Sequence, residues 1–219
     1  MPATASRPLR RDAQRNRERI VAAAREVFAT RGFAATLDDV AHHAGVGVGT
    51  VYRRFPTKEA LVEAIFADRI EGVVAVAEQC LAEPSAWDGL TRFMVYACHT
   101  HAEDRGLRDV MLSLGMKKRF PDSGDRLETV ITELVARAKD EGTLRTDFEA
   151  TDVPIIFTMV SDLAGAPAGA YDRYLRLVID GLRACPRNAD LGPALTRDQV
   201  IGVLSGCVPP VRPRSSAAQ

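Results

Sequence analysis

The chain has 219 residues, of which 46% are hydrophobic and 26% charged, a balance that excludes wholesale disorder and allows one or two globular domains. Its 29 basic residues balance its 29 acidic ones, yet residues 1–58 carry a net charge of +6 and residues 59–219 a net charge of −6. Four cysteines without a CxxC pair are too few for a disulfide scaffold, and the polar first residues lack the apolar segment of a signal peptide, so we expect a cytoplasmic protein.

The first 84 residues are predicted to form a basic arm and four helices. Residues 1–14 are polar and rich in arginine, which predicts disorder. Apolar residues then recur at steps of three and four, with breakers between the runs, which predicts helices over 15–31, from Thr36 to Gly45, over 47–55 and over 57–83. Thr36 and Thr57 are favourable N-cap residues, and Gly45 suits a tight turn that needs a positive φ angle.

The rest of the chain repeats this helical pattern. Glycine and proline separate further helices expected at about 86–103, 106–117, 122–141, 150–164 and 170–185, with a short one at 196–204. Few segments alternate as strands do. We therefore predict an all-α protein of about nine helices, in which a three-helix N-terminal domain precedes a larger helical domain.

Residues 37–55, LDDVAHHAGVGVGTVYRRF, have the pattern of a helix-turn-helix. The turn falls at Ala44-Gly45-Val46, and Ala41 is small where the two helices must approach each other. The apolar positions expected to pack the pair against helix 15–31 are Val40, Ala44, Val46, Val51 and Phe55.

The outer face of the second of these helices is predicted to enter the DNA major groove. At 100° per residue, Val51 and Phe55 point inward while Gly49 and Arg53 point outward. Arg53 is the candidate for reading guanine, because arginine pairs well with guanine O6 and N7. The predicted DNA-binding residues, including those expected to contact phosphates, are Thr36, Gly47, Val48, Gly49, Thr50, Tyr52, Arg53, Arg54 and Lys58.

Four runs of residues then identify a family. They are FAATLDDVA at 33–41, AGV at 44–46, GTVYRRF at 49–55 and KEAL at 58–61. Together they resemble the DNA-binding region of the TetR family of bacterial repressors, and YLRLVIDGL at 174–182 is similar to an ending common in such proteins. The chain departs from the family at Gly47, where relatives often carry a Ser, Thr or Asn cap.

The resemblance implies a domain organisation. Residues 15–60 would bind DNA, 61–190 would bind a ligand and dimerise, and 191–219 would form a short helix and a flexible tail. The apolar stripes of the last two long helices predict a homodimer interface with Ile156, Val160, Tyr171, Tyr174, Leu175, Val178 and Leu182. The candidate lining of an effector pocket is Phe93, Met94, Tyr96, Met111, Met116, Phe120 and Phe157, which suits an apolar or amphipathic small molecule.

The expected function is sequence-specific transcription regulation. The resemblance implies a repressor that binds a palindromic operator in double-stranded DNA as a homodimer and is released by a small-molecule effector. A transcriptional activator, or a regulator of the same fold without a ligand, remains the alternative. The sequence shows no catalytic triad, metal cluster or phosphate loop, because the glycines at 45–49 follow no strand and lead to no Lys-Ser/Thr pair. We therefore expect that the chain is not an enzyme and that it has no cofactor, no metal site and no membrane partner.

Overall fold

The computed structural model describes residues 6–112, 116–161, 163 and 170–204, and within them the chain forms eleven α-helices and no extended strand. The all-α prediction is confirmed. The helices are α1 (Ser6–Arg31), α2 (Leu37–Ala44), α3 (Val48–Arg54), α4 (Lys58–Leu81), α5 (Ala86–Glu103), α6 (Arg105–Met111), α7 (Met116–Arg119), α8 (Pro121–Asp140), α9 (Asp152–Ser161), α10 (Ala170–Gly181) and α11 (Arg197–Leu204), with a short 3₁₀ turn, η1 (Gly32–Ala34), after α1.

Two predicted segments differ from the structure. Residues 6–14, which the sequence predicts to be disordered, form the first turns of α1, and residues 1–5 lie outside the described residues. The single helix predicted over 106–117 is two helices, since α6 ends at Met111 and α7 begins at Met116. The ranges predicted above amount to ten helices, one more than the stated total of about nine, and the split of 106–117 accounts for the eleventh among the described residues. Most of the predicted tail, residues 205–219, is also outside the described part.

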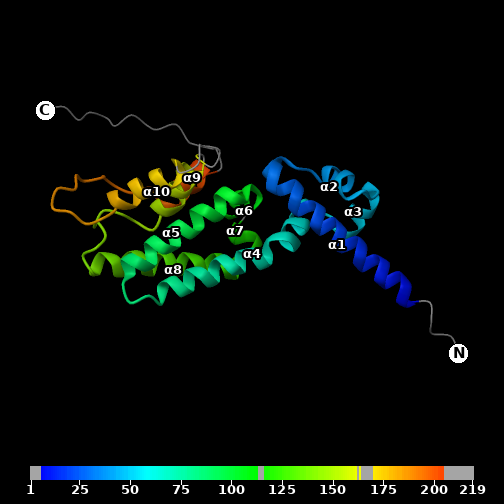
Figure 1. Ribbon diagram of the computed structural model, residues 1–219, viewed down its shortest axis with the longest axis horizontal. Coiled ribbons are helices and arrows are strands. Elements are labelled where there is room, and N and C mark those ends of the chain that lie inside the picture. The colour runs from blue at the N-terminus through cyan, green and yellow to red at the C-terminus, as the bar shows by residue number, and fades with distance from the viewer. Residues whose placement is uncertain (1–5, 113–115, 162, 164–169, 205–219) are drawn as a thin grey trace.

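The N-terminal unit consists of α1, α2 and α3, which lie together at one end of the molecule (Figure 1). Its core is built from side chains at helical spacing on each element, such as Phe28 of α1, Val40 of α2 and Val51 of α3, all fully buried. Burial of this apolar face holds the two short helices in place, because helices of seven or eight residues are only marginally stable alone.

Helix α4 joins this unit to the C-terminal bundle (Figure 1). Thr57 caps it by accepting a hydrogen bond from the backbone N–H of Ala60 at 3.2 Å. Its first turns pack on α1, and its later turns pack on α5 and α8. A displacement of α4 in the bundle therefore moves the N-terminal unit as well. No helix in the described ranges is long and apolar enough to cross a membrane.

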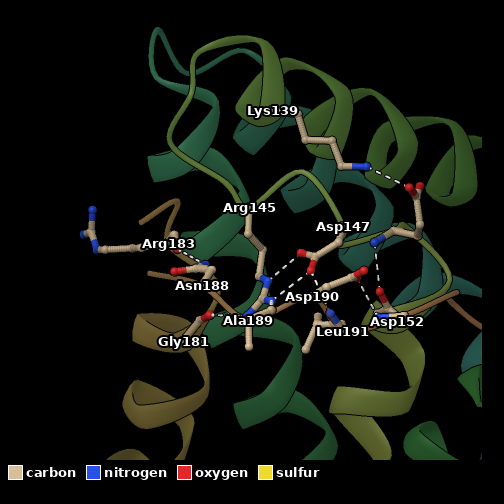
Figure 2. Close-up of polar contacts among 12 residues, drawn as sticks. Lys139, Arg145, Asp147, Asp152, Gly181, Arg183, Asn188, Ala189, Asp190 and Leu191 are labelled. Atoms are coloured by element: carbon tan, nitrogen blue, oxygen red, sulfur yellow. Dashed lines mark hydrogen bonds and ion pairs between the residues drawn. The ribbon is translucent and has the colours of Figure 1, made fainter. Parts of the chain in front are cut away.

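Hydrogen bonds around a salt bridge in the loop before α9 tie this loop to the end of α10 and to the chain that follows it (Figure 2). Arg145 donates to both carboxylate oxygens of Asp147, at 2.6 and 2.9 Å, and to the carbonyl oxygens of Gly181 and Ala189. Asp147 also accepts from the N–H of Leu191 at 3.0 Å. These hydrogen bonds, that from Arg145 foremost, hold the pKa of Asp147 well below its usual range. These contacts hold the segment between α10 and α11 against the bundle, and α11 then packs on α9.

Candidate nucleic-acid interface and ligand cavity

Helix α2 begins at a complete capping box. The hydroxyl of Thr36 accepts from the N–H of Asp39 at 3.1 Å, and the Asp39 carboxylate accepts from the Thr36 N–H at 2.9 Å. Arg31 adds an ion pair to Asp39 at 2.7 Å. The hydrogen bonds from Thr36 and the charge of Arg31 lower the pKa of Asp39, so its carboxylate stays ionised as a cap acceptor to a more acidic pH than an ordinary aspartate. The polar groups of Thr36 are thus engaged within the protein, and its contact with phosphate stays a prediction.

The turn between α2 and α3 is built on Gly45. Its backbone lies in the left-handed region, at φ 63° and ψ 38°, which L side chains rarely adopt. Its N–H donates to the carbonyls of Ala41 and His42, and Arg19 of α1 donates to the Ala44 carbonyl at 2.8 Å. The turn is therefore anchored to α1, and this anchor sets the direction of α3.

The two faces of α3 are those predicted. Val51 is fully buried, whereas Val48 and Tyr52 are 43% and 45% exposed, and Gly49 and Arg53 are exposed beside them. A Cβ atom built on Gly49 meets nothing within 4 Å, so this face is open. Arg53 lies along its own helix, with Nε 3.2 Å from the Gly49 carbonyl oxygen and a guanidinium nitrogen 3.3 Å from the Thr50 hydroxyl. Among the described residues its guanidinium contacts only its own helix, so the predicted contact with a base would require this side chain to turn outward.

The remaining predicted DNA-binding residues surround this face. Gly47 is the N-cap of α3 and supplies no side-chain cap, and Arg54 is exposed at the other end of the helix. Lys58 is half-buried, with its ammonium group 5.7 Å from the centroid of the Phe28 ring. Burial lowers the pKa of Lys58. Lys58 thus combines a packing contact with its predicted phosphate contact.

The Lys58→Ala variant is expected to bind all DNA sequences more weakly and to flatten the dependence of log K on log salt by about one unit per chain, hence about two for a dimer, because each lost phosphate contact would have released about one counterion. Removing the contact with Phe28 should also cost about 0.5–1 kcal/mol of stability. Anisotropy titrations at several salt concentrations measure the slope. Lys139→Ala, whose side chain pairs with Glu149 in the bundle, is the control. An unchanged slope in Lys58→Ala would remove this residue from the interface.

The C-terminal bundle contains a cavity of about 320 Å³. Four residues predicted for an effector pocket line it: Phe93, Met111, Met116 and Phe157. Met94, Tyr96 and Phe120 are not among its lining residues. Met94 is fully buried in the core beside the cavity, because it lies 100° around α5 from Phe93.

Sequence reasoning missed four ionisable residues on the cavity wall, which are His101, Lys117, Glu128 and Arg197. His101 was detectable, because Phe93, Ala97 and His101 are spaced by four residues and share one face of α5. Burial lowers the pKa of His101 to about 4, with a smaller contribution from the charge of Arg108. Arg197 was not detectable, since it reaches the cavity only because α11 folds back over α9. No group of three or more metal-binding side chains occurs among the described residues.

The residues predicted for a dimer interface divide into two sets. Val160, Leu175 and Leu182 are buried within the chain itself, while Ile156, Tyr171 and Val178 are half-buried and Tyr174 is 45% exposed. The most exposed apolar side chains of these helices, Met159 of α9 and Leu177 of α10, are 64% and 66% exposed and are not among the seven residues predicted for the interface. The spacing of Tyr174 and Leu177 was a signal, because residues three apart share one face of a helix.

Comparison with known proteins agrees with this architecture. The family model of bacterial regulatory proteins of the tetR family matches residues 20–65, and that of the C-terminal domain of SbtR-like transcriptional regulators matches residues 85–184. A crystal structure of a TetR transcriptional regulator from Streptomyces coelicolor is 30% identical, with a TM-score of 0.50, over 77% of this chain and 98% of that one.

Two curated relatives are also transcriptional regulators of the helix-turn-helix type. The regulator UidR of Escherichia coli K12 is 31% identical over 58% of this chain, and SrpR of Pseudomonas putida is 28% identical over 61%. The matched part of the chain spans 65% of the length of each. The relatives named here are regulators, which confirms the expectation that the chain is not an enzyme. By both family models and by its likeness to these regulators, the chain belongs to the TetR family of bacterial regulatory proteins.

Proposed function

We propose that this chain is a sequence-specific DNA-binding transcriptional regulator that represses transcription as a homodimer on a palindromic operator and is released by a small-molecule effector. The observation that carries the proposal is the exposed face of α3. There the side chains of Val48, Tyr52 and Arg53 project into solvent beside Gly49, while Val51 packs the opposite face of the helix into the core. An exposed helix of this kind fits the major groove, and the excess positive charge of residues 1–58 suits DNA phosphates.

Binding to DNA that flanks the chain's own gene tests the proposal. Anisotropy titrations should give salt-dependent binding with two chains per operator, and footprinting should protect two half-sites about 34–36 Å apart or a multiple of that spacing. Absence of salt-dependent binding to this DNA would refute the proposal. A reporter gene under the same operator then separates repression from activation, since deletion of a repressor raises expression and deletion of an activator lowers it.

The exposed apolar side chains of α9 and α10 support the homodimer. Met159, Tyr174 and Leu177 are large, apolar and solvent-exposed in the single chain. Such exposed groups mark interaction surfaces when they lie on neighbouring elements, and α9 and α10 pack against each other. Two copies related by a two-fold axis would pair this surface with itself and place two α3 helices on one side of the DNA.

The Leu177→Glu variant is expected to dissociate the dimer, because each interface would then hold two buried carboxylates without partners. Light scattering after gel filtration at micromolar concentration should show the mass of one chain, and operator affinity should fall with it. Leu191→Glu is the matched control, since this exposed leucine lies outside α9 and α10. A variant that keeps the wild-type dimer mass would place the interface elsewhere.

Helix α6 connects the cavity to the N-terminal unit. Met111 at its end lines the cavity, while Gly106 at its start lies so close to α1 that an added Cβ would be 2.8 Å from the Phe28 carbonyl oxygen. Asp104 caps α6 by accepting from the N–H of Leu107 at 2.8 Å, and it also pairs with Arg69 of α4. A ligand that moves Met111 would therefore push α6 against α1 and α4, which changes the separation of the two α3 helices.

The Gly106→Ala variant is expected to lose about 1–3 kcal/mol of stability and to bind the operator more weakly, because its methyl group forces α6 away from the backbone of α1. Urea unfolding and anisotropy titrations measure the two effects. Gly72→Ala is the matched control, because a Cβ on this glycine of α4 meets nothing within 4 Å, and alanine there favours the helix. Wild-type operator affinity in Gly106→Ala would show that α6 does not position the DNA-binding unit.

A further inference from the structure

His101 is a buried polar side chain on the wall of the cavity. It is 2% exposed, and its ring meets that of Phe157 edge-on, with centroids 5.5 Å apart. Neither Nδ1 nor Nε2 has a hydrogen-bond partner within the part of the chain that the structure describes. Buried polar atoms in native proteins are nearly always paired. Two unpaired nitrogens beside a cavity of about 320 Å³ therefore indicate a partner that enters the cavity.

The imidazole selects among the polar groups that a ligand can carry. It is neutral at pH 7, because burial and the nearby charge of Arg108 lower the pKa of His101 to about 4. A neutral imidazole offers one N–H donor and one acceptor nitrogen. A carboxylate can use only the donor and an ammonium group only the acceptor, and either would bring a buried charge. A hydroxyl group can use the donor or the acceptor without that cost.

The charged residues of the cavity wall are already paired. Lys117 Nζ lies 2.5 Å from a carboxylate oxygen of Asp125 and 2.6 Å from one of Glu128. Arg197 lies 2.9 Å from the same oxygen of Glu128. Two cations thus face two carboxylates, so this group favours neither an anionic nor a cationic ligand. Most of the other lining is apolar and includes Phe93, Leu127, Ile131 and Phe157.

We propose that the cavity binds a small, uncharged, mainly apolar molecule with one alcohol or phenol hydroxyl, and that this hydroxyl forms its hydrogen bond with His101. The volume is near the lower end of the range for ligand pockets, about 300–1,000 Å³, which suits a molecule of one ring with a short chain. That this molecule acts as the effector rests on the proposed function. Its binding to the cavity does not depend on that function.

Titration calorimetry of the full chain with three probes of one shape tests the proposal. The probes are 4-propylphenol, which carries a hydroxyl, propylbenzene, which has no polar group, and 4-propylbenzoate, which carries a negative charge. We expect the phenol to bind at least about tenfold more tightly than propylbenzene, because only the hydroxyl pairs with the imidazole, and more tightly than the benzoate. Equal dissociation constants for phenol and propylbenzene, tightest binding of the benzoate, or no detectable binding of the phenol would overturn the proposal.

Two variants and one spectrum assign the contact to His101. His101→Phe should lose the preference for the phenol, while His101→Gln, which keeps a donor and an acceptor, should retain part of it. In the wild-type chain, the His101 ring resonances should shift with the phenol far more than with propylbenzene, a readout that does not depend on how the variants fold. The opposite pattern of shifts would refute the contact. Neither measurement contains DNA, so a failure of operator binding and a failure of this proposal are separate results.

Discussion

Replacing Arg53 with alanine should weaken binding of the dimer to its operator by roughly 30-fold or more. A side chain that pairs with a guanine in the major groove is worth about 1–3 kcal/mol, and a dimer loses two such contacts. Arg53 is exposed on the open face of α3, and within the described part of the chain its guanidinium contacts only its own helix. The loss should be largest on the cognate operator and small on unrelated DNA, so the variant should also discriminate less between sequences.

Arg54→Ala is the matched control for this experiment. Arg54 is the neighbouring residue, carries the same charge and is also exposed, but it is predicted to contact phosphate. Its loss should weaken cognate and unrelated DNA alike and reduce the salt slope. Anisotropy titrations with both DNAs at two salt concentrations separate the two effects. If Arg53→Ala binds the cognate operator as the wild-type chain does, Arg53 makes no base contact.

The stability of the chain should depend on pH through His101. Its pKa is about 4 in the folded chain and about 6.5 in the unfolded chain, so below pH 6.5 the unfolded state binds a proton that the folded state does not. The free energy of unfolding should therefore be unaffected by His101 above pH 7. It should fall as the pH drops from 6.5 toward 4, by about 2 kcal/mol at pH 5 and by roughly 3 kcal/mol near pH 4.

Urea unfolding of the wild-type chain and of His101→Gln between pH 5 and 8 measures this contribution. Glutamine does not titrate, so the variant should lose less stability than the wild-type chain on acidification, and the difference between the two proteins should change by about 2 kcal/mol between pH 8 and pH 5. The value at pH 8 serves as the control for packing changes caused by the substitution. A difference that is constant with pH would mean that His101 is protonated equally in both states.

The N-terminal unit could be predicted almost residue by residue because its signals are local. Thr36 caps a helix through Asp39 three residues away, and Gly45 ends it by adopting a positive φ angle. Val51 is buried and Arg53 exposed because α3 has the periodicity of an ordinary helix. Each of these outcomes depends on residues within one or two helical turns, so the local sequence is enough to predict it.

The segment predicted to be a disordered arm shows where the same reasoning fails. Residues 6–14 lack an apolar face, and so their composition predicts disorder, yet they continue α1 as helix. Helix extension from an existing helix needs no new nucleus, so a polar segment of ordinary propensity can join a helix that packing stabilises further along.

The sequence by itself determined the helical class, the helix-turn-helix and the residues that α3 presents to solvent. Only the tertiary structure decided which apolar residues enclose a cavity and which fill the core, because that depends on helices distant in the chain. Phe93, His101 and Arg197 meet around one space since α5, α9 and α11 pack together. Burial there, rather than any local pattern, lowers the pKa of His101 and leaves its nitrogens without a hydrogen-bond partner among the described residues.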